Sequence, residues 1–164
     1  MSEPHHPYPV VVVGYDGSPA SHVALSRGVA RVGTTGKLYL VHAWQVPEAW
    51  RGRGQYEPAI ARALTEAEAV LERAKPAHPG LSGVSWEREL IGAPPARAIA
   101  DVAAVRQADE IILGTRGIGR VRALLGSVAH EVIHLASCPV TVIPERMVPE
   151  RPAPEPVHAA VTPG

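Results

Sequence analysis

The sequence has 164 residues, of which 46% are hydrophobic and 20% are charged, and these proportions are typical of one soluble globular domain. Its 16 basic and 16 acidic residues give a formal net charge of zero, which argues against general binding to nucleic acid or to an anionic membrane. The single cysteine, Cys138, excludes an intrachain disulfide, and no apolar run approaches the roughly 20 residues that span a bilayer, so we expect a cytoplasmic protein.

Three segments of different composition divide the chain. Residues 1–8 are polar and interrupted by proline, which predicts a flexible lead-in. Residues 145–164 hold five prolines and little large apolar material, which predicts a disordered tail. Residues 9–144 lie between them, and we expect them to form the single folded domain.

Strand and helix patterns alternate along residues 9–144. Val10–Val13 is a β-branched run typical of a buried strand. Ser18 followed by Pro19 predicts a helix start, and that helix should end near Val32. The later patterns predict a strand over Lys37–Trp44, a helix over Pro58–Lys75, an edge strand over Val84–Ile91, a helix over Ala96–Arg106, a strand at Ile111–Leu113, a helix opening at Ser127 and a last strand over Val140–Ile143. This alternation indicates an α/β domain with a mainly parallel sheet.

Glycines gather after the strand at Ile111–Leu113. Gly114 ends this strand, Gly117 follows in the loop, and Gly126 precedes Ser127, which is well suited to be an N-cap. Glycines let backbone N–H groups approach a ligand closely, and a helix N-terminus favours an anion. The pattern therefore points to phosphate binding, although a simple turn and a capped helix explain these residues equally well.

Two motifs at opposite ends of the domain resemble the universal stress protein family. One is the run Val10–Ala20, and the other is G-T-R-G at residues 114–117, followed by G-S-V at residues 126–128 and by C-P-V-T-V-I-P at residues 138–144. The resemblance implies a doubly wound α/β fold of the adenine-nucleotide alpha-hydrolase type, with helices on both faces of five parallel strands in the order 3-2-1-4-5. In that order, the turn at Asp16 and the loop after Gly114 face each other across one crevice.

The same resemblance implies a site for ATP or another adenine nucleotide with Mg²⁺, which phosphate oxygens bridge and which no protein side chain holds. Asp16 would hydrogen-bond to the ribose or its surroundings, and the backbone of Val41 would meet the adenine. The backbone of the glycine motifs would cradle the phosphates. The full set of candidate nucleotide-binding residues is Tyr15, Asp16, Val41, Gly114, Thr115, Arg116, Gly117, Gly126, Ser127 and Val128. We expect no catalytic residue and, at most, slow incidental hydrolysis of ATP.

Several candidates also have a purely structural interpretation. Asp16-Gly17 is typical of an Asx-turn that ends a strand. Arg116 could neutralise phosphates, whereas a solvated loop is the favoured interpretation of Arg120 and Arg122. Only eight residues separate Gly117 from Gly126, against nine in the ATP-binding pattern of the family. This difference supports the alternative function, which is a family member that binds no nucleotide and acts as a dimeric protein-interaction module.

Residues 130–134 spell H-E-x-x-H, the zinc-protease motif. Histidines four residues apart on a helix can reach one metal ion, with Glu131 as the base, but a catalytic zinc also needs a third ligand. Few candidates follow in the sequence, and most of them lie in the tail. We expect a surface histidine pair on a helix whose core-facing stripe is formed by Val128, Val132, Ile133 and Ala136.

The last strand is short and apolar. An apolar strand at a sheet edge is normally covered or paired, and the family resemblance implies a homodimer that pairs Val140, Thr141, Val142 and Ile143 with their counterparts. We expect Cys138, just before this strand, to be a buried and unreactive thiol. The function expected overall is regulatory: a stress-response protein that binds ATP between its first and fourth strands.

Overall fold

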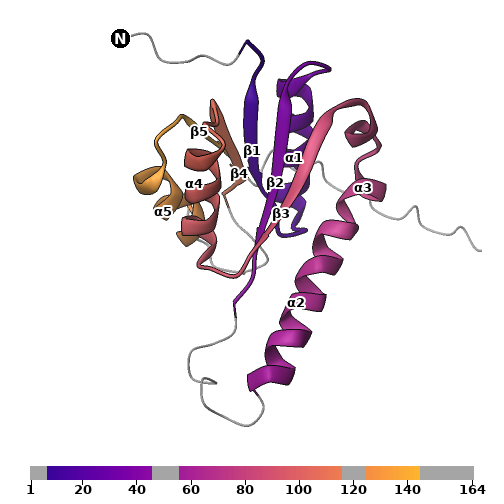
Figure 1. Ribbon diagram of the computed structural model, residues 1–164. Helices are drawn as coiled ribbons and strands as arrows, with labels where there is room; N and C mark the ends of the chain where they lie inside the picture. Colours follow the sequence, from indigo (N-terminus) through magenta and orange to yellow (C-terminus); the bar gives the residue numbers. More distant parts are fainter. Residues whose placement is uncertain (1–6, 46–55, 116–124, 145–164) are drawn as a thin grey trace, which may run out of the picture.

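The computed structural model describes residues 7–45, 56–115 and 125–144. In these residues five parallel strands form one sheet in the order β3-β2-β1-β4-β5, as expected from the family resemblance (Figure 1). The strands are β1 (Val10–Gly14), β2 (Lys37–Ala43), β3 (Ser85–Ile91), β4 (Glu110–Gly114) and β5 (Val140–Ile143). The helices are α1 (Pro19–Val32), α2 (Tyr56–Glu72), α3 (Ala74–Ala77), the 3₁₀ helix η2 (Pro79–Gly83), α4 (Pro95–Val105) and α5 (Ser127–Leu135).

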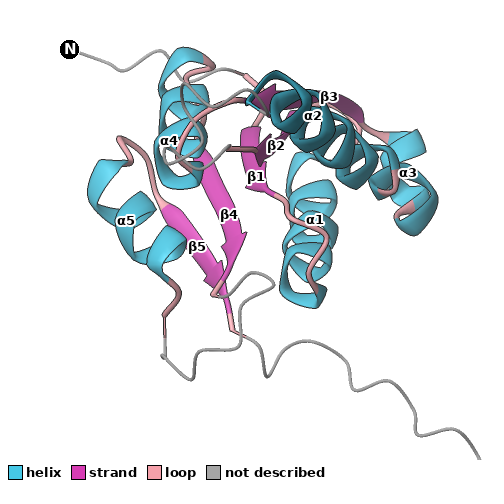
Figure 2. Cartoon of the chain, turned by 90° about the horizontal axis from the view of Figure 1, so that it is seen from below, coloured by secondary structure: helices cyan, strands magenta, loops and turns pink. Residues whose placement is uncertain are grey.

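Helices cover both faces of the sheet. Figure 2 shows α4 and α5 on one side and α1, α2 and α3 on the other. The side chains of β1 show why both faces are covered, because successive side chains of a strand point to opposite faces of the sheet. Val11 and Val13 belong to the core under α1, whereas Val12 belongs to the core under α4 and α5. The unbroken β-branched run of β1 therefore supplies both cores at once.

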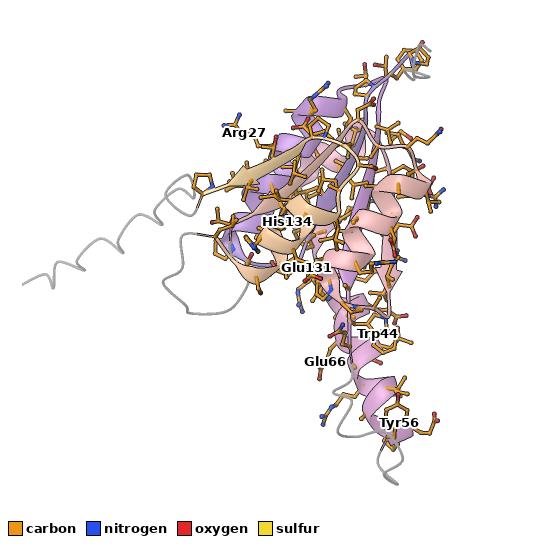
Figure 3. All side chains as sticks on the ribbon, turned by 90° about the vertical axis from the view of Figure 1, so that its left-hand side faces the viewer. Arg27, Trp44, Tyr56, Glu66, Glu131 and His134 are labelled. Atoms are coloured by element: carbon orange, nitrogen blue, oxygen red, sulfur yellow. The ribbon has the colours of Figure 1, made fainter. Side chains whose placement is uncertain are left out.

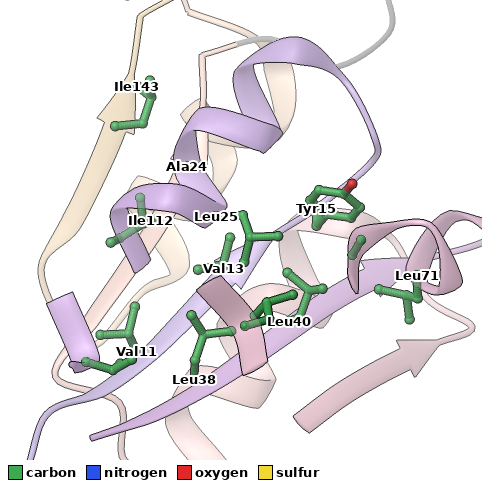
Figure 4. Close-up of a cluster of buried hydrophobic side chains, with 13 residues drawn as sticks. Val11, Val13, Tyr15, Ala24, Leu25, Leu38, Leu40, Leu71, Ile112 and Ile143 are labelled. Atoms are coloured by element: carbon green, nitrogen blue, oxygen red, sulfur yellow. The ribbon is translucent and has the colours of Figure 1, made fainter. Parts of the chain in front are cut away.

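The core under α1 is aliphatic except for Tyr15, which lies at one end of the cluster (Figure 4). Leu25 of α1 packs with Leu38 and Leu40 of β2, and Leu71 of α2 completes this group. All four leucine side chains are buried. The sequence contains no Phe, and small and medium aliphatic side chains, packed in two layers, fill the core instead.

Helix α1 begins and ends as its sequence predicts. Ser18 is the N-cap, its hydroxyl accepts the N–H of Ser21 at 3.3 Å, and Pro19 occupies the first helical position. The helix ends at Gly33, whose φ of +56° is unfavourable for residues with a Cβ. The N–H of Gly33 donates to the carbonyl oxygen of Val29.

Two expectations about helices are wrong. The helix expected over Pro58–Lys75 is α2 followed by the separate helix α3, and Pro76 lies inside α3. Pro76 is tolerated there because it sits in the first turn, where its missing N–H would have no partner within the helix. Ile133, which was expected in the core-facing stripe of α5, is 47% exposed, whereas Ala129 and Val132 fill that stripe.

Candidate functional site

The strand order reverses between the parallel strands β1 and β4, which lie side by side: β2 and β3 are added on one side of β1, and β5 is added on the far side of β4. The segment after β1 leads to α1 on one face, and the segment after β4 leads to α5 on the other. Parallel sheets bind their ligands outside the carboxyl ends of the strands at such a point, because the departing connections leave a crevice there.

A crevice of about 580 Å³, which includes space open to solvent, lies at this point. Five of the sequence-predicted site residues line it, and they come from the segment after β1 and from β2, β4 and α5. They are Tyr15, Asp16, Val41, Gly114 and Val128. The structure thus brings together residues up to 113 positions apart in the sequence.

The segment that follows β1 is held to β2 on both sides of Tyr15. The N–H of Tyr15 donates to the carbonyl oxygen of Val41 at 2.9 Å. The carbonyl oxygen of Tyr15 accepts a hydrogen bond of 2.7 Å from the Nδ1–H of His42. Because Nδ1 of His42 is the donor in this bond, only Nε2 remains as a ring nitrogen for a ligand.

The Tyr15 side chain closes the crevice from the core side. It is 3% exposed, and burial raises the pKa of its hydroxyl above the ordinary value. The positive charge of Arg73 acts in the opposite direction, and the negative charge of Asp16 adds to the increase in pKa. The hydroxyl therefore stays neutral at physiological pH.

Asp16 forms the Asx-turn that its sequence indicates. Its Oδ1 accepts the N–H of Ser18 at 2.9 Å, and Gly17 follows with a φ of +79°. Asp16 also lines the crevice and is half-buried. The structural interpretation of Asp16 is therefore confirmed, and its contact with a ribose stays a prediction.

The end of β4 and the beginning of α5 meet at Thr115. The N–H of Thr115 donates to Ile143 at 2.8 Å, and its carbonyl oxygen accepts the N–H of Gly126 at 2.6 Å. These bonds bring Gly126 beside the end of β4 at the edge of the crevice. The predicted phosphate residues Arg116 and Gly117, and the further arginines Arg120 and Arg122, lie outside the described residues.

The predicted N-cap of α5 is wrong by one residue. Gly126 is the N-cap, with an extended backbone at φ −69° and ψ 156°, and Ser127 is the first helical residue. The N–H of Gly126 is committed to Thr115, which fixes the cap one residue earlier than the hydroxyl of Ser127 suggests. Ser127 is exposed and makes no capping hydrogen bond, and neither Gly126 nor Ser127 is among the residues that line the crevice.

Several lining residues are not among the predicted site residues, chiefly Ser18, Ser21, His42 and Ile99. Ser18 was predicted only as the N-cap of a helix, and Ser21 was not singled out. His42 follows the predicted adenine contact Val41, and its polarity inside an apolar strand was the available signal. Ile99 comes from α4, and only the packing of that helix on β1 and β2 brings it to the crevice.

The histidines of the H-E-x-x-H motif lie on the surface, as expected. Figure 3 shows Glu131 and His134 on the outer side of α5. The rings of His130 and His134 are 4.8 Å apart between centroids, and both side chains are exposed. Within residues 7–45, 56–115 and 125–144, no group of three or more His, Cys, Asp or Glu residues is arranged to hold a metal ion. In the same ranges, no helix has the length and apolar character required to cross a membrane.

Comparison with known proteins agrees with this geometry. Residues 7–144 match the model of the universal stress protein family. A universal stress protein of Thermus aquaticus is 34% identical over 139 residues, which cover 83% of this chain and 98% of that protein. The chain spans about half the length of the mycobacterial universal stress proteins that it matches.

Solved structures of universal stress proteins share the fold. The UspA protein of Lactobacillus plantarum superimposes with a TM-score of 0.70 at 23% identity, covering 85% of this chain and 99% of that one. A universal stress protein solved in complex with cAMP gives a TM-score of 0.63 at 24% identity, covering 84% and 98% of the two chains.

Proposed function

The chain belongs to the universal stress protein family, and from this premise we propose that it binds an adenine nucleotide in the crevice between β1 and β4. The observation that carries the proposal is that Asp16, Val41 and Gly114 line one cavity, at the point where the strand order of the sheet reverses. The cAMP complex of a protein with the same fold gives support from outside the chain.

ATP with Mg²⁺ is the ligand that we propose. Val41, Ile99 and Leu113 give the crevice an apolar part suited to a base, and Asp16 offers a carboxylate for the ribose. The phosphates would then extend from Gly114 toward Gly126, with Mg²⁺ bridging their oxygens. The backbone N–H groups of residues 115 and 126 already donate within the protein, so the phosphates would depend on residues 116–117 and on the first turn of α5.

The proposed role is regulatory binding in the cytoplasm, without turnover beyond slow incidental hydrolysis of ATP. Oδ1 of Asp16 accepts from Ser18, and Nδ1 of His42 donates to Tyr15. Asp16 and His42 each keep a second side-chain atom that could act as a base, so phosphate release is measured with saturating Mg-ATP, and we expect it to be negligible. Occupancy of the crevice would instead alter a surface that a second copy or another protein reads.

We also propose that β5 mediates a homodimer. The two sheet edges differ in chemistry: β3 carries Glu87, Arg88 and Glu89, whereas β5 reads Val-Thr-Val-Ile. Charged residues discourage a strand edge from pairing with another chain, and apolar β-branched residues favour it. The edge at β5 is therefore the better surface for a second copy.

Calorimetry with Mg-ATP on nucleotide-stripped protein tests the proposed ligand. We expect micromolar affinity, near one nucleotide per chain, with binding lost in Gly117→Val. Asp16→Ala would break both the ribose contact and the Asx-turn. Asp16→Asn removes the charge but keeps an acceptor for the N–H of Ser18, so it tests the ribose contact with the turn intact. The absence of binding at millimolar Mg-ATP would contradict the proposal and would favour a dimeric interaction module.

A further inference from the structure

Two histidines 56 residues apart join the first turn of α1 to the segment between α3 and η2. Nδ1 of His22 lies 2.8 Å from Nε2 of His78, and both side chains are half-buried. His78 also joins two helices through its backbone, because its N–H donates to Ala74 and its carbonyl oxygen accepts the N–H of Leu81. The pair therefore ties the junction of α3 and η2 to α1.

The ring geometry shows that the contact is a hydrogen bond between nitrogens. The ring planes differ by 25° and the centroids are 5.0 Å apart. With facing nitrogens at 2.8 Å, this centroid separation is the one expected when two imidazoles meet edge to edge in nearly one plane. Such a contact needs one proton between the two nitrogens, since one must donate and the other must accept.

The neighbouring hydroxyl of Ser26 fits one arrangement of these protons. The hydroxyl donates to the carbonyl oxygen of His22 at 3.1 Å, so its oxygen is free to accept from Nδ1–H of His78 at 3.4 Å. Nε2 of His78 is then the acceptor, and Nδ1–H of His22 is the donor. A proton added to Nε2 of His78 would set two N–H groups against each other and break the contact.

The same histidine pair adjoins the crevice. Nδ1 of His22 lies 3.3 Å from the hydroxyl of Tyr15, and the two rings meet edge to face with centroids 5.3 Å apart. Tyr15 and Ser21, the residue before His22, both line the crevice. A change at the histidine pair therefore reaches two walls of the proposed nucleotide site through direct contacts.

The surroundings of the pair disfavour added positive charge. His22 lies in the first turn of α1, where the helix dipole opposes a cation. Burial lowers the pKa of His78 below its ordinary value of 6.5, and the neighbouring His22 lowers it further. Asp16 and Arg73 act on Tyr15 beside the pair, and Lys75 lies in α3 three residues before His78; of these three charged groups, only Asp16 carries a negative charge.

We propose that the His22–His78 pair is a pH-sensitive latch, which holds the first turn of α1 and Tyr15 in place at neutral pH and weakens nucleotide binding when it opens in acid. The coupling to the nucleotide rests on the proposed function, whereas the latch itself does not. Because the pKa of His78 is lower in the folded chain than in the unfolded chain, the latch contributes its full stability above pH 6.5 and loses it as the pH falls below that value.

The first test compares the wild-type chain with His78→Gln and with His130→Gln. The Oε1 of a glutamine at position 78 can accept from His22 and does not titrate, whereas His130→Gln removes an exposed histidine of α5 outside the latch. Urea unfolding is measured between about pH 7.5 and pH 5.5, which brackets the usual titration of histidine. We expect the wild type and His130→Gln to lose more stability in acid than His78→Gln does. Equal losses in all three proteins would overturn the latch.

The second test measures Mg-ATP affinity of the same three proteins at both pH values. Dividing each wild-type constant by the His78→Gln constant at the same pH cancels the protonation of ATP itself. We expect the ratio of the wild-type to the His78→Gln dissociation constant to be about two- to tenfold larger at the acidic pH than at pH 7.5, as for the loss of one hydrogen bond. An unchanged ratio overturns the coupling. No binding by any of the three proteins at pH 7.5 overturns the proposed function and the coupling together, and the unfolding data still decide on the latch.

Discussion

The imidazole of His42 donates a hydrogen bond of 2.7 Å to the carbonyl oxygen of Tyr15. The residue before His42, Val41, accepts the N–H of Tyr15. Both backbone groups of Tyr15 are therefore bound to β2, and the exit from β1 is fixed at the point where the crevice begins. His42 thus acts as a positioning residue for the crevice as well as part of its lining.

Substitution of His42 by leucine tests this role. His42→Leu leaves the carbonyl oxygen of Tyr15 without its side-chain donor, and we expect a loss of about 1 kcal/mol in the free energy of unfolding. His42→Asn is the matched control, because its side-chain amide occupies a position similar to Nδ1 and can donate to Tyr15. Urea unfolding and Mg-ATP calorimetry would measure both variants. A leucine variant as stable and as tightly binding as the wild type would contradict the role.

Gly28 of α1 marks the closest approach of that helix to the sheet. A Cβ built on Gly28 would lie 2.6 Å from Cγ2 of Val13 and 3.0 Å from Cδ1 of Leu38. Val13 is β-branched and stiff at χ1, so it cannot turn aside easily. Helix α1 can therefore pack this closely against β1 and β2 only because Gly28 has no side chain.

Gly28→Ala should destabilise the protein although alanine is the better helix former. Overpacking costs about 1–3 kcal/mol, against roughly 1 kcal/mol gained in helix propensity. We expect a net loss of about 1 kcal/mol in urea unfolding. Gly83→Ala is a suitable control, because a Cβ there meets nothing within 4 Å. Unchanged or higher stability of Gly28→Ala would show that α1 can move off the sheet at little cost.

The fold was predictable because local signals and the family pattern agree. The β-branched run of β1 and the Ser18-Pro19 helix start each specify one structure, and both are confirmed. The strand order came from the resemblance, since strand periodicity holds no information on which strands are neighbours. The cap of α5 was mispredicted because the hydrogen bond from Gly126 to Thr115 is a tertiary contact that local sequence preference does not report.

The candidate site was predictable only in part. Motif residues such as Asp16 and Gly114 follow strands at their carboxyl ends, and the sheet order brings them together. Ile99 and the His22–His78 pair have no local signal of that kind. They meet their partners only because helices far apart in the sequence pack against the same sheet, and the sequence pattern does not specify those distances.

The thiol of Cys138 should react slowly with alkylating reagents. Burial raises its pKa above the ordinary value of 9.0, and the carboxylates of Asp109 and Glu110 raise it further. Because only the thiolate is nucleophilic, the folded chain holds less of the reactive form at any pH below that value. We expect iodoacetamide to modify the native protein more slowly at pH 8 than the urea-unfolded protein, as followed by mass spectrometry. Equal rates would contradict this.

The raised pKa of Cys138 also predicts that the protein loses stability at alkaline pH. The unfolded chain loses its thiol proton first as the pH rises through about 9, so the contribution of Cys138 to stability falls above that pH. Cys138→Ala removes this titrating group. The midpoint of unfolding should therefore change less between about pH 8 and pH 10 in the variant than in the wild type. An equally steep decline in the variant would assign the alkaline loss to other groups.

Thr141 tests the proposed dimer through β5. It is the exposed residue of this edge strand, and its hydroxyl donates to Glu110 of β4 at 2.5 Å. A lysine at this position would set two like charges near each other across a β5–β5 pairing, so Thr141→Lys should shift the protein toward monomer in sedimentation velocity. Ala104→Lys, an exposed change on α4, should leave the assembly unchanged. If the wild type is already a monomer at micromolar concentration, or if Thr141→Lys remains a dimer, then β5 does not mediate the assembly.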